Sequence, residues 1–138
     1  MAREQNLETS GAVFATFKIK QTTGVDDLHD ADIGKAVQIT NNYEVSTTGS
    51  GSMVLGKLVD LTLTDADNGK RVATVQIAGI MTLPITTTYP AIGNMVVGGA
   101  SGTVKQAPAL TGYDPAGGAI ARGTVVSVNG TTDCTLII

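Results

Sequence analysis

Gly56-Lys57-Leu58-Val59-Asp60-Leu61-Thr62-Leu63 is the stretch that decides the fold, because a glycine is followed at once by an alternating apolar run. Related phrases begin at four other glycines: Gly34-Lys-Ala-Val-Gln-Ile-Thr, Gly93-Asn-Met-Val-Val, Gly102-Thr-Val and Gly123-Thr-Val-Val-Ser-Val. Glycine turns the backbone at little steric cost, and β-branched residues at every second position suit a pleated, half-buried surface. The chain therefore predicts many short strands separated by turns. The phrases are irregularly spaced, so they indicate no solenoid or propeller repeat.

Apolar residues recur at every second position along most of the chain, which is typical of strands rather than helices. We expect strands at residues 13–20, 35–40, 53–64, 70–78, 80–85, 92–97, 102–106, 121–128 and 134–138. Asn68-Gly69 and Asn129-Gly130 are favoured hairpin turns. The best helical candidate is Val25–Gly34, where Asp26 or Asp27 could cap at most one short helical turn.

The longest strand signal, residues 53–64, makes a specific prediction about which side chains face the core. Its alternation places four side chains on one face: Leu55, Val59, Leu61 and Leu63. Residues 47–52 (Thr-Thr-Gly-Ser-Gly-Ser) are expected to form a flexible loop tip. Pro84 assigns its strand to the edge of a sheet, because proline cannot donate to a ladder of hydrogen bonds.

These patterns together predict a single all-β domain. We expect a small β-barrel or β-sandwich of about eight to ten short antiparallel strands over residues 12–138, preceded by an extended N-terminal arm at residues 1–11. A chain of 138 residues is long enough to bury a core without covalent cross-links. Cys134 is the only cysteine, so no intrachain disulfide is expected and a reducing site of synthesis fits.

Charged residues make up only 15% of the chain, with a net charge of −3, whereas an ordinary domain has about 25%. A domain with so few charges can present an uncharged surface suited to lying against neighbouring molecules. Alternatively, it can be an ordinary β domain whose solubility comes from hydroxyl groups. The basic residues are scattered, and only Lys70-Arg71 are adjacent, which argues against binding nucleic acid. No stretch approaches the roughly 20 apolar residues of a membrane span, and the N-terminus does not resemble a signal peptide. We therefore expect neither membrane nor nucleic acid as a partner, and the cytoplasm as the starting point.

The strongest candidate for a chemical site is the acidic loop Asp26-Asp27-Leu28-His29-Asp30-Ala31-Asp32. Carboxylates and an imidazole could bind a divalent cation. The spacing fits no defined metal loop, and such clusters usually face water. Asp65-Ala-Asp67-Asn-Gly69 also departs from a calcium loop, because its glycine and its closing acidic position are both wrong. We predict no metal site, and the role of the acidic loop stays open.

The sequence offers little for catalysis. His29 is the only histidine, and no serine elbow of the form G-x-S-x-G accompanies it. Cys134 lies in an apolar terminal strand, where a thiol is usually a small buried hydrophobe. Gly98-Gly-Ala-Ser-Gly-Thr103 lacks the lysine of a phosphate-binding loop. We therefore predict no catalytic residues, no cofactor and no enzymatic activity.

Taken in order, the segments resemble the small capsid decoration (cement) proteins of tailed bacteriophages. The resemblance rests on a polar N-terminus followed by five phrases: Gly34-Lys-Ala-Val-Gln-Ile-Thr, Val54-Leu-Gly-Lys-Leu-Val, Ala73-Thr-Val-Gln-Ile-Ala-Gly-Ile-Met, Ile92-Gly-Asn-Met-Val-Val and Ala121-Arg-Gly-Thr-Val-Val-Ser-Val. In that family a β-barrel core presents successive strands of the form G-x-x-V and ends in a short hairpin. The similarity covers roughly residues 30–138 in style.

The resemblance implies a structural virion protein. Such a protein binds the outside of an assembled capsid, often as a homotrimer, and bridges neighbouring major capsid subunits; assembly takes place in the host cytoplasm. An N-terminal arm commonly adds a strand to the capsid surface, which is β-augmentation in physical terms. The residues in that position are Ala2, Arg3, Glu4, Gln5, Asn6, Leu7, Glu8, Thr9 and Ser10.

Two other functions compete with this interpretation. The first is a carbohydrate- or receptor-binding β module on a virion, such as a head fibre base or a small adhesin. Sugar stacking needs exposed aromatic rings, and Tyr89 and Tyr113 lie in proline-containing loops where they could supply a surface contact. The second is a small hydrolase that uses His29 as its base.

Overall fold

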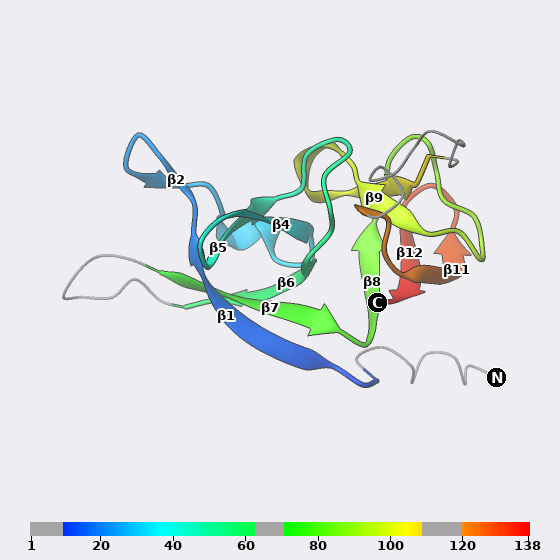
Figure 1. The fold of residues 1–138 in the computed structure, drawn as a ribbon, viewed down its shortest axis with the longest axis horizontal. Helices are drawn as coiled ribbons and strands as arrows, with labels where there is room; N and C mark the ends of the chain where they lie inside the picture. The colour runs from blue at the N-terminus through cyan, green and yellow to red at the C-terminus, as the bar shows by residue number, and fades with distance from the viewer. Residues whose placement is uncertain (1–9, 63–70, 109–119) are drawn as a thin grey trace.

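The computed structural model describes residues 10–62, 71–108 and 120–138, and all structural statements below concern these ranges. Within them the chain is all-β, as the sequence predicts, and the strands form two regions side by side (Figure 1). The N-terminal region is a closed five-stranded barrel, here called the barrel. Residues 79–108 and 120–138, here called the C-terminal region, form a three-stranded sheet and a hairpin.

The barrel contains β1 (Val13–Ile19), β4 (Ala36–Asn41), β5 (Glu44–Thr47), β6 (Gly56–Leu61) and β7 (Val72–Ala78). Its strand order is β1-β5-β4-β6-β7, and β1 closes it by pairing with β7. All neighbours are antiparallel except β1 and β5, which run parallel. The sequence predicted only antiparallel strands, and this part of the prediction is wrong. The intervening segments return the chain so that β5 runs in the direction of β1.

Short elements fill the connection between β1 and β4. These are β2 (Gln21–Thr22), β3 (Val25–Asp26) and the single-turn 3₁₀ helix η2 (Asp30–Asp32). The helical turn lies inside the range that the sequence predicts. Its N-cap is His29 rather than Asp26 or Asp27, and the His29 backbone N–H donates to Asp32 Oδ2 at 2.9 Å.

The C-terminal region contains a sheet in the order β11-β12-β8, formed by β8 (Ile80–Pro84), β11 (Thr124–Asn129) and β12 (Asp133–Ile137). Pro84 lies on an edge strand, as predicted, and the chain ends in the central strand β12. Beside this sheet lies the hairpin of β9 (Val96–Gly98) and β10 (Val104–Gln106). The 3₁₀ turn η3 (Ala100–Gly102) joins them and is a second helical turn that the sequence did not predict.

Each region has its own hydrophobic core. The barrel core consists of Ile19, Leu28, Val37, Val45, Leu58, Leu61, Ala73 and Val75. The second core consists of Ala36, Val54, Met81, Leu83, Ile85, Val96, Val104, Val125, Cys134 and Leu136. Ala36 and Val54 belong to the barrel half of the chain, yet they pack in the second core. The two regions therefore share a packed boundary.

The predicted core face of residues 53–64 is partly wrong. Leu61 is buried as expected, but the fully buried neighbour is Leu58 rather than Val59. Leu58 pairs with Val75 and Asp60 pairs with Thr74, so Val59 is an extra residue in the ladder. Such a bulge shifts the alternation by one position. Leu63 lies outside the described residues, as does the Asn68-Gly69 turn.

Residues 47–52 do not form a free loop tip; they are fixed against the C-terminal region. Gly51 donates to the Gly98 carbonyl at 2.8 Å, and Gly98 donates to the Ser52 carbonyl at 2.7 Å. A Cβ atom at Gly98 would lie 2.7 Å from the Gly49 carbonyl oxygen, so only glycine permits this approach. Local composition predicts flexibility, but these long-range hydrogen bonds prevent it.

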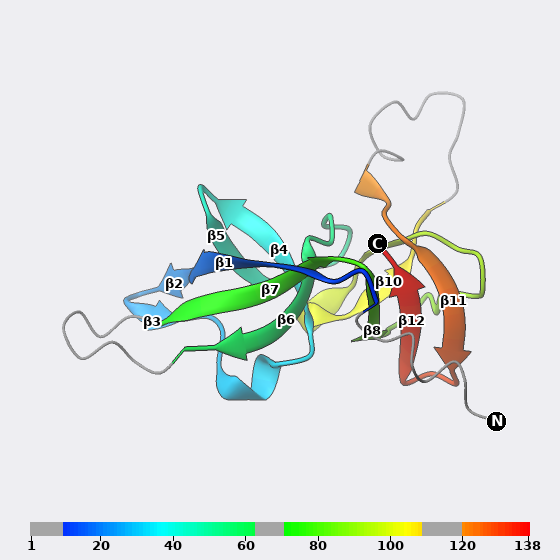
Figure 2. The same cartoon turned by 90° about the horizontal axis from the view of Figure 1, so that it is seen from below.

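A corner at Gly79 connects the two regions, and the start of the described chain lies against it (Figure 2). Gly79 has a φ of +101°, and a Cβ atom there would lie 2.7 Å from the Ser10 carbonyl oxygen. That oxygen accepts a hydrogen bond from the Ile80 N–H at 3.0 Å. The side chain of Gln76 is fully buried and donates to the carbonyls of Ala78 and Ile80. The root of the predicted arm is thus held at the first residue of β8.

Candidate functional site

Charge separates the two regions. In the described part of the C-terminal region the charged residues are Lys105, Arg122 and Asp133. The described part of the barrel carries Lys18, Lys20, Asp26, Asp27, Asp30, Asp32, Lys35, Glu44, Lys57, Asp60 and Arg71. Most of the few charged residues therefore lie in the barrel, and the described part of the C-terminal region is almost uncharged.

The two basic residues of the C-terminal region are directed toward the barrel side. Arg122 donates from Nη1 to the carbonyls of Val54 at 2.7 Å and Leu55 at 3.1 Å. Lys105 donates from Nζ to Ser50 Oγ at 2.8 Å. Both cations thus hold segments of the barrel half against the C-terminal region, and they contribute little charge to its outer surface.

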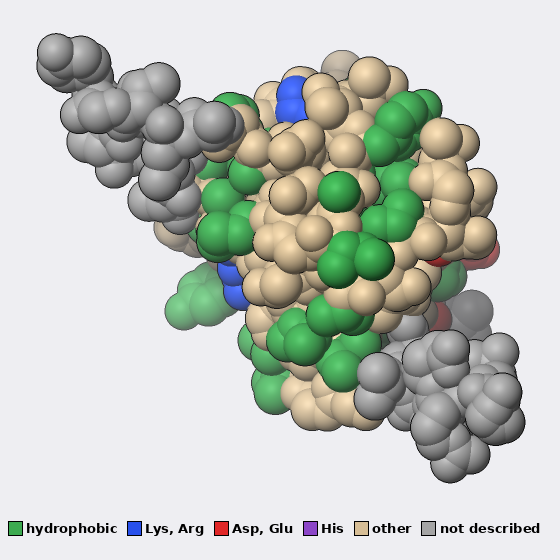
Figure 3. Space-filling model, turned by 90° about the vertical axis from the view of Figure 1, so that its right-hand side faces the viewer, with side chains coloured by type: hydrophobic (Ala, Val, Ile, Leu, Met, Phe, Trp, Pro, Cys, Tyr) green, Lys and Arg blue, Asp and Glu red, His purple; other side chains and the backbone are tan. Residues whose placement is uncertain are grey.

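Apolar side chains are exposed on this uncharged end. We call the set Tyr89, Ile92, Met95, Val126 and Ile137 the uncharged surface. Ile92 is 72% exposed, which is unusual for a side chain of its size. Figure 3 shows the corresponding face, where apolar side chains are interspersed with uncharged atoms and charged side chains lie toward the margins.

Backbone hydrogen bonds bring the segments of the uncharged surface together. Val125 makes two backbone hydrogen bonds with the turn at residues 93–94. The Gly93 N–H donates to the Val125 carbonyl at 2.8 Å, and the Val125 N–H donates to the Asn94 carbonyl at 2.9 Å. Ala107 donates to the Met95 carbonyl at 3.0 Å, and Gln106 donates to the Thr88 carbonyl at 2.8 Å. The turn is therefore fixed to β11 on one side and the loop with Tyr89 is fixed to β10 on the other.

The outer face of the three-stranded sheet carries hydroxyl groups. Alternation along β8 and β12 turns Met81, Leu83, Cys134 and Leu136 into the core. The side chains between them point outward, and Thr82 Oγ1 and Thr135 Oγ1 are hydrogen-bonded at 2.9 Å. Ser127 lies opposite Thr135 in the ladder. The hydroxyl groups of this face can form hydrogen bonds with a partner, and Asp133 at the start of β12 lies on the same face.

The predicted site residues are distributed as follows. Residues 2–9 and Tyr113 lie outside the described residues, and Ser10 is the described end of the arm. Tyr89 is exposed and belongs to the uncharged surface. The sequence did not single out Ile92, Met95 or Val126. The available signal was the near absence of charge after Gly79, which is visible in the sequence but does not show which apolar residues stay exposed.

The carboxylates of the acidic loop have partners inside the protein. Asp32 pairs with Lys35 at 2.9 Å, and Asp30 pairs with Arg71 at 2.7 Å. Asp26 and Asp27 accept hydrogen bonds from the side chains of Gln21 and Thr22. Among residues 10–62, 71–108 and 120–138, no group of three or more potential metal ligands is present. These contacts give the loop a structural role in fixing the β2–β3 hairpin and η2.

Two titratable groups have shifted pKa values. Partial burial raises the pKa of Asp32, but hydrogen bonds from Lys35 and the His29 backbone, with the Lys35 charge, outweigh burial and hold it below its usual value. Burial, assisted by the charge of Asp133, raises the pKa of the Cys134 thiol to about 12. Cys134 therefore stays protonated, which agrees with the prediction that it is a buried hydrophobe.

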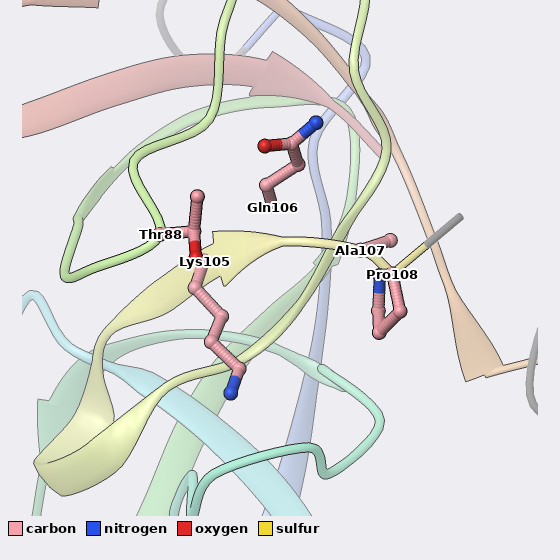
Figure 4. A pocket seen from close by; sticks show the side chains of 5 residues that line it. All are labelled: Thr88, Lys105, Gln106, Ala107 and Pro108. Carbon is pink, nitrogen blue, oxygen red and sulfur yellow. The ribbon is translucent and has the colours of Figure 1, made fainter.

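A hollow of about 300 Å³ borders the uncharged surface and is lined by Thr88, Lys105, Gln106, Ala107 and Pro108. Figure 4 shows that the side chains of Lys105 and Gln106 extend to opposite sides of β10. A ligand or catalytic site requires polar groups that converge on one point. The lining residues of this hollow do not meet that requirement.

Comparison with protein-family models, with characterised proteins and with solved structures finds no match to this chain. Within the described ranges, none of the helices has the length and hydrophobicity needed to cross a bilayer. The candidate site therefore rests on geometry and composition.

Proposed function

We propose that this protein is a structural virion protein that binds the outer surface of an assembled phage capsid and stabilises it by bridging neighbouring major capsid subunits. The uncharged surface is the observation that carries this proposal. Its exposed apolar side chains and hydroxyl groups suit close, partly hydrated packing against another protein. It has few aromatic anchors of the kind that give tight binding between two free proteins.

A lattice of identical subunits compensates for weak individual contacts. Modest binding at each position becomes strong when several positions are engaged at once, because later contacts form at high effective concentration. The arm supports the same arrangement, since Ser10 is bound to the first residue of β8, in the sheet that carries the uncharged surface. Residues 2–9 directly precede Ser10 in the sequence. We propose the major capsid protein lattice as partner and a homotrimer as the bound form.

The test is electron microscopy of particles with and without the protein. We expect additional density at regular positions on the capsid exterior, and a higher temperature of particle disruption when it is present. Unassembled capsid subunits mixed with the protein in solution serve as the control and should bind weakly. Tight one-to-one binding to those free subunits, or no density on particles, would contradict the proposal.

Tyr89 supports the alternative, a carbohydrate- or receptor-binding module. Its ring is 44% exposed next to Thr88, which lines the hollow of about 300 Å³. Glycan-array binding that is lost in Tyr89→Ala or Tyr113→Ala would favour this alternative. Tyr43→Ala is the matched control, because Tyr43 is 78% exposed on the β4–β5 turn of the barrel.

A further inference from the structure

A second hollow lies at the boundary of the two regions. It has a volume of about 340 Å³, and we call it the junction pocket. One wall is formed by Ala31 of η2 and by Ile33–Lys35, which follow it. The other is formed by Thr82–Pro84 of β8, by Thr132 and by Asp133, the first residue of β12. The pocket lies between the η2 turn and the β8–β12 pair, which are separate elements in Figure 2 and are far apart in the sequence.

The walls of the junction pocket are apolar and fixed. Ile33 is 42% exposed at its mouth, and Leu83 and Pro84 lie on the opposite wall. Gly34 has a φ of +99°, and its N–H donates to the Leu58 carbonyl of β6 at 2.7 Å. This bond ties the wall to the barrel, so Ile33 stays exposed instead of collapsing into the core. A preformed apolar hollow of this size is at the lower end of the range for ligand sites.

Within residues 10–62, 71–108 and 120–138, one carboxylate at the junction pocket has no partner among the charged groups around it. Lys35 is neutralised by Asp32 at 2.9 Å, and Asp30 is neutralised by Arg71 at 2.7 Å. Asp133, which lines the pocket, has no hydrogen bond or ion pair from its carboxylate to any residue in the described ranges. The pocket therefore combines an apolar hollow with one uncompensated negative charge, which is complementary to a cation.

We propose that the junction pocket binds an extended peptide segment of a partner protein in which an apolar side chain is followed by lysine or arginine. The apolar side chain occupies the hollow between Ile33 and Pro84, and the basic side chain pairs with Asp133. The volume of about 340 Å³ accommodates side chains of this size but not a folded element. This proposal goes beyond the capsid-binding function and does not depend on it.

The probe is a short blocked peptide, acetyl-Gly-Leu-Arg-Gly-amide, titrated into the full chain and followed by NMR. We expect shifts of the amide signals of Ile33, Leu83 and Asp133, and binding about five times tighter than that of acetyl-Gly-Leu-Glu-Gly-amide. The serine analogue, acetyl-Gly-Ser-Arg-Gly-amide, should bind more weakly than the leucine peptide. Signals that shift elsewhere, or equal binding of the Arg and Glu peptides, would overturn the proposal.

Substitutions test the apolar part and the charged part of the junction pocket separately. Ile33→Ser should abolish the shifts, whereas Ile39→Ser should not, because Ile39 is 44% exposed on β4 and does not line the pocket. Asp133→Asn should remove the preference for the Arg peptide while leucine is still bound, and a preference that persists would contradict the role of Asp133. If a peptide of residues 1–9 binds this pocket more tightly than the Arg peptide, the occupant is the arm of another copy and the proposal fails. Particle binding is scored separately, so either proposal can fail alone.

Discussion

The barrel and the C-terminal region are built from similar short strands around similar aliphatic cores, but their surfaces differ. The barrel carries most of the described charges, and several of them are paired within the acidic loop. The C-terminal region carries three, two of which are turned toward the barrel half. Interior packing determines the fold in both regions. The difference in surface charge therefore distinguishes the two regions, and the proposed capsid contact rests on it.

The two regions differ in surface charge, but their residues pack together and form hydrogen bonds across a shared boundary. Ala36 and Val54 lie in the second core, and Arg122 binds the carbonyls of residues 54 and 55. Across the boundary, the Gly51 N–H donates to the Gly98 carbonyl, and the Gly98 N–H donates to the Ser52 carbonyl. We therefore expect the two regions to unfold together, although their surfaces differ in charge.

The largest expected effect is on barrel closure. A Cβ atom at Gly56 would overlap the Gln76 carbonyl oxygen, so Gly56→Ala forces β6 and β7 apart. We expect a loss of about 4 kcal/mol or more in the free energy of unfolding, measured by denaturant titration. Gly49→Ala is the control, because its Cβ atom would meet nothing closer than the Gln38 side chain at 3.8 Å. A Gly56→Ala protein as stable as the control would contradict this account of the barrel.

Matched core truncations test whether the two regions unfold as one unit. Leu58 in the barrel and Leu136 in the C-terminal region are both fully buried. Leu→Ala at either position should lower stability by about 3 kcal/mol, through lost burial and a residual cavity. Calorimetry should show a single transition that moves to lower temperature in both variants. Two transitions, of which each variant shifts only one, would show that the shared boundary does not couple the regions.

A lysine at the uncharged surface tests where the partner binds. Ile92→Lys should weaken binding to capsid particles about tenfold, because a charge must be desolvated in the contact. Val25→Lys is the control on the barrel, since Val25 is also highly exposed, on the β2–β3 hairpin. Co-sedimentation with particles measures both. Equal loss of binding in the two variants would remove the functional distinction between the regions.

The Asp32–Lys35 pair predicts a small pH-dependent effect in the barrel. The pKa of Asp32 is lowered in the folded protein, so its contribution is present at neutral pH and is lost as pH falls through and below about 4. Asp32→Asn should reduce stability by about 0.5–1 kcal/mol at neutral pH and by less at acidic pH. Asp60→Asn, at an exposed aspartate of β6, is the control. Thermal melts at several pH values measure the difference.

The smallest effect concerns Cys134, which reports opening of the C-terminal region without a substitution. Its thiol is fully buried and its pKa is raised to about 12. We expect almost no reaction with a disulfide reagent at mildly alkaline pH, and full reaction in concentrated denaturant. Rapid labelling under native conditions would show that the C-terminal region opens independently of the barrel.

Much of the fold could be predicted from alternation alone. The strands at 13–20, 80–85 and 134–138 form as expected, and Pro84 lies at a sheet edge. The errors have a common physical origin, because they depend on partners distant in the sequence. The bulge at Val59, the fixed loop at residues 47–52 and the parallel pairing of β1 with β5 are all set by neighbouring strands.

The candidate site could be predicted only in part. Tyr89 was selected as a loop aromatic and is exposed, but Ile92, Met95 and Val126 were not selected. In a strand pattern these residues look like any other apolar position. Their exposure follows from the way in which the 93–94 turn is bonded to β11. The junction pocket was invisible for the same reason, since its two walls are far apart along the chain.

The sequence by itself determined the strand-rich, all-β character of the chain, the place of the Asn129-Gly130 hairpin turn and the shortage of charge, because each depends on residue type and local spacing. The tertiary structure decided how the glycine-led strands divide into a barrel and a second sheet. It also decided which apolar side chains stay in contact with water and that the acidic loop is paired internally. Those properties depend on long-range pairing and packing, in which residues distant in the sequence compete to cover the same surface.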